Sequence, residues 1–213
     1  SWAYGDLSLD ASIRRDIGSA SGSYAGAVQS SRDMNSDGVI SQVEQSVSGI
    51  DLANASIVNY SWGYNSYSAG ANYQFNKDWA MFGRVSKGGR ANADRLLFGK
   101  VNADGSVARE DAIDQVKQYE LGSKSRHGNL NLFATLFFAE TDEQNFEAST
   151  QRFFDRVYQA KGIELESSYR IGDFDMRGSV TWTDAEISKD ALTPEVVGNT
   201  PRRQADFVYN LLA

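Results

Sequence analysis

The segment 33–44 carries oxygen-bearing residues at the spacing of a twelve-residue calcium-binding loop. Gly38 falls where such a loop turns sharply, and Glu44 falls where a bidentate carboxylate closes it. The predicted ligands are Asp33, Asn35, Asp37, Val39 (through its carbonyl), Ser41 and Glu44. The pattern predicts an outside loop stiffened by weakly bound Ca²⁺, with a dissociation constant of ~10⁻⁴–10⁻³ M. The alternative is an Asx-rich turn that binds nothing specific.

Catalytic residue sets are missing from the sequence. It contains no cysteine and a single histidine, His127, which falls in a predicted tight turn. No Ser-His-Asp set and no phosphate-cradling glycine loop is present. Glu164 and Glu166 are two residues apart, which is the period of a strand face and not evidence of a catalytic cleft. We therefore expect a protein that is not an enzyme.

Composition narrows the class of partner. The net charge is -7 and the sequence pI is about 4.8, which disfavours a nucleic-acid partner. No apolar run approaches the ~20 residues that a membrane helix needs. A membrane-crossing strand needs only roughly 10 residues, of which every second one is apolar. The negative mean hydropathy is therefore compatible with a membrane β-barrel.

Hydrophobicity alternates with a period of two along several segments, so that one face is apolar and the other polar. The clearest runs are 7–13, 67–75 and 174–182. We expect eight strands, at 4–14, 60–75, 78–87, 115–126, 129–140, 152–170, 173–184 and 201–213. Tight turns are expected at Asn76-Lys77, His127-Gly128 and Gly172-Asp173, and long polar connections at 15–59, 88–114, 141–151 and 185–200. Short turns alternating with long loops predict an antiparallel up-and-down transmembrane β-barrel with short periplasmic turns and long extracellular loops.

Aromatic residues gather near the expected strand ends. Rings with a polar handle favour the headgroup layer of a membrane, so two girdles are predicted. The short-turn girdle comprises Tyr4, Tyr73, Phe75, Trp79, Tyr169 and Phe174, and the long-loop girdle comprises Trp62, Tyr64 and Trp182. The alternative is that these rings form the ordinary core of a β-sandwich.

Charged residues alternate with the apolar ones, and we expect them to face the barrel lumen. The set is Arg84, Glu120, Lys124, Arg126, Glu164, Glu166, Arg170, Asp175 and Arg177. These side chains either contact a plug and line the path of cargo, or form a salt-bridge ladder across neighbouring strands. The ladder is the favoured reading.

The stretch from Tyr119 to Ala213 resembles TonB-dependent outer-membrane receptors. The resemblance is carried by YELGSK (119–124), LNLFATLFF (130–138), AKGIELE (160–166) and NTPRRQA (199–205), with VSKGGR (85–90) upstream. It implies a roughly 22-stranded plugged barrel that takes up scarce nutrients with energy from the TonB complex. Typical cargo is a siderophore–iron complex, cobalamin or a carbohydrate.

The sequence shows no TonB box, no plug and no terminal aromatic strand, so we expect residues 1–213 to be part of the barrel wall of such a receptor. The expected location is the outer membrane of a Gram-negative bacterium. The expected partners are outer-membrane lipid, the receptor's own plug, the TonB complex and a small-molecule or oligosaccharide cargo. The alternatives are a passive porin or autotransporter barrel, and a soluble extracellular β-sandwich that binds Ca²⁺ and acts in adhesion or carbohydrate binding.

Overall fold

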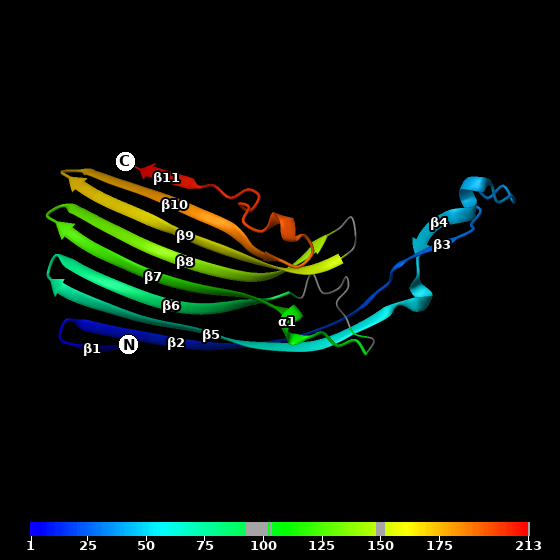
Figure 1. Cartoon of the computed structure of the whole chain (residues 1–213), viewed down its shortest axis with the longest axis horizontal. Helices are drawn as coiled ribbons and strands as arrows, with labels where there is room; N and C mark the ends of the chain where they lie inside the picture. Colours follow the sequence, from blue (N-terminus) through cyan, green and yellow to red (C-terminus); the bar gives the residue numbers. More distant parts are fainter. Residues whose placement is uncertain (93–101, 103, 148–151, 213) are drawn as a thin grey trace.

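One antiparallel sheet contains most of the chain in the computed structural model, which describes residues 1–92, 102, 104–147 and 152–212. Each strand pairs with its neighbour in sequence, as in a meander, apart from a hairpin inserted between β2 and β5 (Figure 1). The strands of the sheet are, in order, β1 (Trp2–Tyr4), β2 (Leu7–Tyr24), β5 (Ser56–Asn76), β6 (Trp79–Ala91), β7 (Ile113–His127), β8 (Leu130–Glu147), β9 (Arg152–Ile171), β10 (Phe174–Asp190) and β11 (Phe207–Leu212).

The tight turns all lie at one end of the sheet, which we call the short-turn end (Figure 1). Gly5, Gly128 and Gly172 each open a two-residue turn with φ values of 58°, 59° and 56°. A glycine tolerates this left-handed conformation, and such turns match the twist of a β-hairpin. The fourth turn, between β5 and β6, is closed by the Asp78 amide, which donates to Asn76 Oδ1 at 2.9 Å. The three predicted tight turns are present: the turn at Gly172-Asp173 is as expected, and the other two lie one residue later, at 77–78 and 128–129.

At the end of the sheet opposite the short turns, which we call the long-loop end, the strands extend further than the sequence predicted. The connection expected at 15–59 contains the remainder of β2, the start of β5 and a separate hairpin of β3 (Ala27–Ser30) and β4 (Val47–Ile50). This hairpin projects beyond the main sheet (Figure 1). The expected loops at 141–151 and 185–200 are also shortened by β8, β9 and β10. The apolar run ends at the charged border residues, and the apolar residues beyond it, such as Val58, Tyr60 and Ile187, fall on the opposite face, where they are buried.

Two of the expected strands were wrong in other ways. The strand expected at 4–14 is broken at Gly5 into β1 and β2, and the strand expected at 201–213 is limited to β11. A 3₁₀ turn at Pro194–Val196 precedes β11, and two others, Gln42–Ser46 and Leu52–Asn54, flank β4. The longest α-helical segment described is α1 (Arg109–Ala112). No helix in the described ranges is long and apolar enough to cross a membrane.

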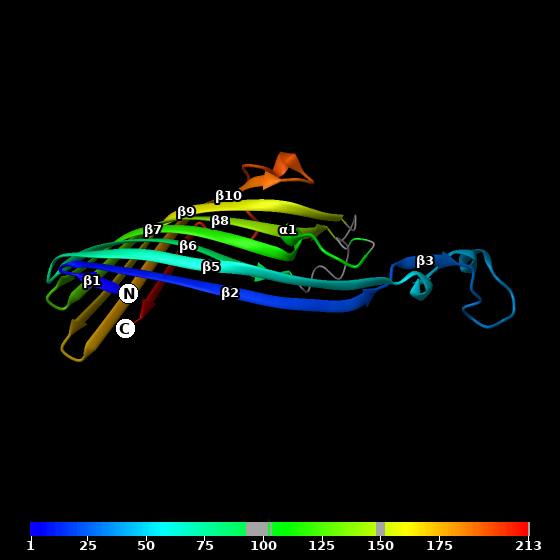
Figure 2. The same ribbon diagram turned by 90° about the horizontal axis from the view of Figure 1, so that it is seen from below.

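The described part of the main sheet is a single curved layer (Figure 2). Its buried hydrophobic cluster is small and lies at the long-loop end, where Val58 and Tyr60 of β5 pack with Ala112 and Ile113. A β-sandwich would instead press two apolar sheet faces together. The expectation of an antiparallel barrel wall is confirmed, and the sandwich alternative is wrong for the described residues.

Candidate functional site

The strand register separates the sheet into two chemically different faces. On the first, the apolar face, each strand carries a run of apolar side chains from the short-turn end, with Ser123, Ser125 and Ser167 as small polar exceptions. These runs span about nine residues per strand, close to what a tilted membrane strand requires. A charged residue then ends the run on most strands. These residues are Arg15 on β2, Lys87 on β6, Lys117 on β7, Glu140 on β8, Lys161 on β9 and Asp184 on β10.

Aromatic side chains occupy the short-turn border of the apolar face. Phe75 and Trp79 stack with ring centroids 4.2 Å apart, and Tyr73 meets Phe75 edge-on at 4.8 Å. Tyr169 lies opposite Met176 in the same border. At the long-loop border Trp182 is on this face and is paired with Ile163.

Trp62 and Tyr64 do not belong to a girdle on the apolar face. On β2, Trp62 pairs with Gly18 and Tyr64 pairs with Asp16. The rings of Trp62 and Tyr64 both pack against the buried cluster of Val58 and Tyr60. The two rings stack on each other with centroids 5.9 Å apart. The predicted long-loop girdle therefore needs correction, because these aromatic residues fill a local core above the apolar run.

On the second, polar face the register places all nine charged residues of the predicted lumen-facing set. Arg84 lies opposite Glu120, Lys124 opposite Phe133, and Arg170 opposite Asp175. Only part of the expected salt-bridge ladder forms. Asp175 accepts from Arg170 at 3.0 Å and from Arg177 at 3.2 Å, whereas Arg84 is 3.8 Å from Asp10.

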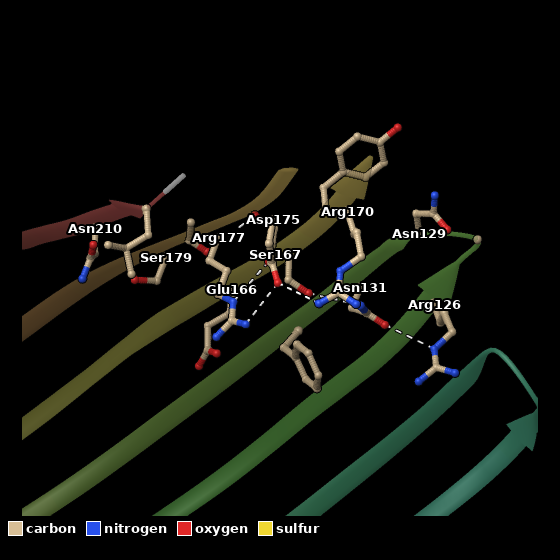
Figure 3. A pocket seen from close by; sticks show the side chains of 16 residues that line it. Arg126, Asn129, Asn131, Glu166, Ser167, Arg170, Asp175, Arg177, Ser179 and Asn210 are labelled. Atoms are coloured by element: carbon tan, nitrogen blue, oxygen red, sulfur yellow. Dashed lines mark hydrogen bonds and ion pairs between the residues drawn. The ribbon is translucent and has the colours of Figure 1, made fainter. Parts of the chain in front are cut away.

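A shallow hollow on the polar face lies near the short-turn end and spans β7 to β11 (Figure 3). Arg126 donates to Asn131 Oδ1 at 3.2 Å, and Asn131 donates to Ser168 Oγ at 3.1 Å, which links three strands by side chains. Glu166 also lines the hollow, and it has no cation within 4.0 Å among the described residues. The hollow thus presents hydrogen-bond donors and a carboxylate without an ion-pair partner to any surface that packs against it.

Three aromatic rings on the polar face lie over glycines of a neighbouring strand. Trp62 covers Gly18, Phe82 covers Gly122 and Phe137 covers Gly162, and each pair is in direct register. A glycine leaves its part of a strand bare, and a cross-strand ring restores packing there. The sequence shows these rings as breaks in the alternation, and the register gives them a structural role.

A buried polar network lies at the long-loop end between β6, β7 and β8. The Asp114 carboxylate accepts hydrogen bonds from the side chains of Arg90 at 2.8 Å and Asn92 at 2.5 Å, and from the backbone N–H of Gln144 at 3.0 Å. At the same end of the sheet, between β9 and β10, the Asp190 side chain is fully buried and pairs with Arg156. Neither group is recognisable in the sequence, because charged residues in polar connections give no sign of burial.

The calcium-like loop forms the tip of the β3–β4 hairpin. The Asp33 carboxylate accepts from the amides of Asp37 and Gly38 at 3.2 and 2.8 Å, and Gly38 has a φ of 82°. Glu44 is only 6% exposed and accepts from the Ser41 hydroxyl at 2.6 Å and from the amides of Ser41 and Met34 at 2.9 Å. These hydrogen bonds, from Ser41 first, lower the pKa of Glu44 to about 2.

The remaining predicted ligands of this loop, Asn35, Val39 and Ser41, lie around the same turn. Within the described ranges, no three side chains of Asp, Glu, His or Cys are gathered closely enough to hold a metal ion. In the structure the loop carboxylates point to backbone amides. Calcium binding by this loop stays a prediction.

The apolar band, the polar opposite face and the alternation of short and long connections define a segment of an outer-membrane β-barrel wall. A family model described as "TonB dependent receptor-like, beta-barrel" matches residues 1–212. The chain therefore belongs to the TonB-dependent receptor β-barrel family, whose members are transporters of the Gram-negative outer membrane and not enzymes.

Solved structures share the fold at low sequence identity. The ferric yersiniabactin uptake receptor FyuA from Yersinia pestis aligns with a TM-score of 0.66 and 16% identity, over 97% of this chain and 28% of that one. The ferric-catecholate import receptor Fiu from E. coli K12 gives 0.66 and 16%, over 98% and 29%. The iron transporter FrpB from Neisseria meningitidis gives 0.57 and 14%, over 98% and 28%. This chain thus spans under a third of those structures. No curated protein matched the sequence.

Proposed function

We propose that this chain is a wall segment of an outer-membrane receptor that actively imports a scarce, large nutrient with energy from the TonB complex. The observation that carries the proposal is the two-faced sheet, whose apolar runs stop at a charged residue after about nine residues per strand. Membership of the receptor family supports the same reading.

The proposal assigns lipid to the apolar face and the barrel lumen to the polar face. A charge on a lipid-facing strand position costs ~2–4 kcal/mol at mid-depth, whereas a lumen position tolerates it. The nine charged residues of the polar face, from Arg84 on β6 to Arg177 on β10, all avoid the apolar run. Lipid contact therefore accounts for the separation of the two residue types.

The partner proposed for the polar face is the receptor's own plug domain. The hollow near the short-turn end offers Arg126, Arg177 and the unpaired carboxylate of Glu166 for contact with a polar protein surface. Charged groups at such a surface set register and orientation more than affinity. A plug seated there would close the lumen between uptake events.

The cargo class proposed first is a siderophore–iron complex, because two of the aligned structures are named as a ferric yersiniabactin uptake receptor and a ferric-catecholate import receptor. Cobalamin and carbohydrate remain the alternatives. Ligand capture is assigned to the long-loop side, within 15–59, 88–114 and 185–200. The β3–β4 hairpin extends this side outward, away from the short turns (Figure 1).

The test is uptake by cells that carry the full-length receptor. Deleting the receptor gene from its host should abolish growth on one iron–siderophore complex as sole iron source, and the intact gene should restore it. Uptake should also cease when TonB is deleted. Uptake that continues without TonB would instead support a passive porin. A surface-exposed protein that imports nothing would support an autotransporter.

A further inference from the structure

Strands β5 and β6 separate beyond the charged residues that end the apolar run. Their pairing stops at Tyr67 and Lys87, although both strands continue beyond these residues. There β5 stays paired with β2 and runs on toward the β3–β4 hairpin, whereas β6 stays paired with β7 and ends (Figure 1). The gap between 56–66 of β5 and 88–91 of β6, which we call the seam, is therefore not closed by pairing of these two strands.

Two further hollows meet at the seam from opposite faces of the sheet. The outer hollow, on the apolar face, has a volume of about 510 Å³ and has Ile13 and Ile113 among its lining residues. The inner hollow, on the polar face, has a volume of about 470 Å³ and has Ser66 and Thr141 among its lining residues. Four residues line both hollows, namely Tyr64, Gly88, Gly89 and Gln115. The two hollows thus lie back to back, with this shared set between them.

The ring of Tyr64 is the largest side chain of the shared set. On β6, Gly88 and Gly89 have no side chains to fill the seam. A Cβ atom at Gly89 would lie 3.0 Å from the Tyr64 ring and 3.1 Å from Ile113, so the ring lies against bare backbone. A side chain can change rotamer without breaking the hydrogen bonds of a strand ladder. This barrier can therefore open while the barrel wall stays intact.

Charged groups in the inner hollow already have partners of opposite sign. Arg14 donates to Asp16 at 2.9 Å, and Arg90 donates to Asp114 at 2.8 Å and lies 3.9 Å from Glu143. Three carboxylates thus accompany two guanidinium groups, which disfavours an anionic ligand. Hydroxyl groups in the same hollow can both donate and accept hydrogen bonds. The inner hollow therefore suits an uncharged group rich in hydrogen-bonding atoms.

The outer hollow suits an alkyl chain. Its aliphatic and aromatic lining continues the apolar run of the sheet, so a chain placed there would reach the hydrocarbon if that run spans the membrane. A molecule with an uncharged, hydrogen-bonding head and a single alkyl tail matches both hollows at once.

We propose that the seam is a lateral portal through which such an amphiphile passes between the membrane border and the barrel lumen, with Tyr64 as the movable barrier. This route depends on the membrane position proposed above for the apolar face, and not on the identity of the imported nutrient. The head would lie in the inner hollow while the tail still lies in the outer one.

The test uses the full-length receptor in liposomes, with dodecyl maltoside that carries a photoreactive diazirine on its sugar head as the probe. A tail held in the bilayer outside the barrel keeps the head outside as well, unless the head passes through the wall. Crosslinks to Ser66 and Thr141, located by mass spectrometry, therefore report passage through the seam. The same sugar without the tail should give far less label, because it does not concentrate at the membrane.

Gly89→Leu fills the seam and should lower the labelling of Ser66 and Thr141 about tenfold, the effect of overpacking a filled site. The matched control is Gly83→Leu, on the same strand and face but where β6 is paired on both sides. A Cβ at this position lies 3.8 Å from its nearest neighbour, so labelling should be unchanged. Equal labelling of the two variants, or equal labelling by the sugar without its tail, would overturn the proposal.

Tyr64→Ala provides an independent variant that removes the barrier instead of filling the gap. It should raise the labelling, whereas Tyr64→Phe keeps the ring and should match the unmodified receptor. All variants should keep the heat-modifiable mobility of a folded barrel. If Gly89→Leu fails to fold, Tyr64→Ala still decides, because labelling that does not rise would contradict a portal closed by this ring.

Uptake of the iron–siderophore complex by Gly89→Leu separates the portal from the proposed function. Lost labelling with normal uptake supports the portal and leaves the transport function intact. Seam-dependent labelling in a receptor that imports nothing would support the portal and contradict the proposed function. Unchanged labelling of Gly89→Leu in a working transporter would contradict the portal alone.

Discussion

The phenyl ring of Phe137 on β8 lies over Gly162, its direct partner on β9. A Cβ atom at position 162 would meet this ring and the backbone carbonyl of Trp182 on the other side. Neither neighbour is the free end of a flexible chain. The glycine is therefore required by the packing of three adjacent strands on the polar face.

Replacing this glycine should destabilise the barrel. We expect Gly162→Ala to lower the free energy of unfolding of the intact receptor by ~1–3 kcal/mol, because the ring must shift out of a filled site. Gly83→Ala is the control, since a Cβ there lies 3.8 Å from its nearest neighbour. Thermal unfolding of both variants in detergent is the measurement, and equal stability of the two would contradict the packing described.

Acid should loosen the tip of the β3–β4 hairpin only at low pH. Glu44 has its pKa lowered from 4.5 to about 2 by hydrogen bonds from Ser41 and Met34. A carboxylate whose pKa is lowered on folding stabilises the folded loop at pH values above its unfolded pKa. This stabilisation is lost as the pH falls through the pKa of the folded state. Amide hydrogen exchange at Met34 and Ser41 should thus stay slow at pH 5 and rise between about pH 4.5 and 2, after correction for intrinsic rates.

The matching control for this pH effect is Glu44→Gln. Its amide accepts hydrogen bonds less strongly and does not titrate, so corrected exchange at Met34 and Ser41 should be faster at pH 5 and flat with pH. Protection in the unmodified protein that is already lost at pH 5 would show that the carboxylate does not hold the loop.

Calcium binding by residues 33–44 is testable in the same segment. A site with a dissociation constant of ~10⁻³ M would gain ~1.4 kcal/mol from 10 mM Ca²⁺. Exchange in the loop should slow about tenfold relative to chelator, and Asp33→Asn should reduce the effect. Identical exchange with Ca²⁺ and with chelator would leave the loop as an Asx-rich turn.

The two faces of β8 predict opposite responses to the same substitution. Leu136→Arg places a charge in the middle of the apolar run and should cost ~2–4 kcal/mol if that face meets hydrocarbon. Thr135→Arg, one residue earlier, places the charge on the polar face and should cost far less. Equilibrium unfolding of the intact receptor in liposomes compares them, and similar losses would remove the case for lipid contact.

Sequence patterning predicted those parts of the fold in which one face must be apolar. From Phe174 to Trp182 every second residue is constrained by the apolar run, so the strand and its two faces could be predicted. Turns were readable for a local reason, because Gly128 and Gly172 occupy left-handed positions.

The features that the sequence did not predict depend on contacts between distant residues, and such contacts produce no periodic pattern along the chain. Beyond Arg15, β2 consists mainly of small and polar residues with Ile17 as the exception among large aliphatic ones, so the sequence was interpreted as a loop. Trp62 and Tyr64 looked like girdle residues because their type fits a membrane border, but the register turns them toward the buried cluster. The pairing of Arg156 with buried Asp190 joins residues distant in sequence, and nothing local marks either one.

Cysteine scanning along β8 tests the central claim most directly, because the described chain has no cysteine of its own. Single cysteines at positions 131–138 of the intact receptor in liposomes would be spin-labelled and probed with oxygen and with a water-soluble nickel complex. The account predicts that oxygen accessibility peaks at Leu132, Ala134, Leu136 and Phe138, while nickel accessibility does not. Accessibility that fails to alternate, or that peaks on the side of Asn131 and Thr135, would contradict it.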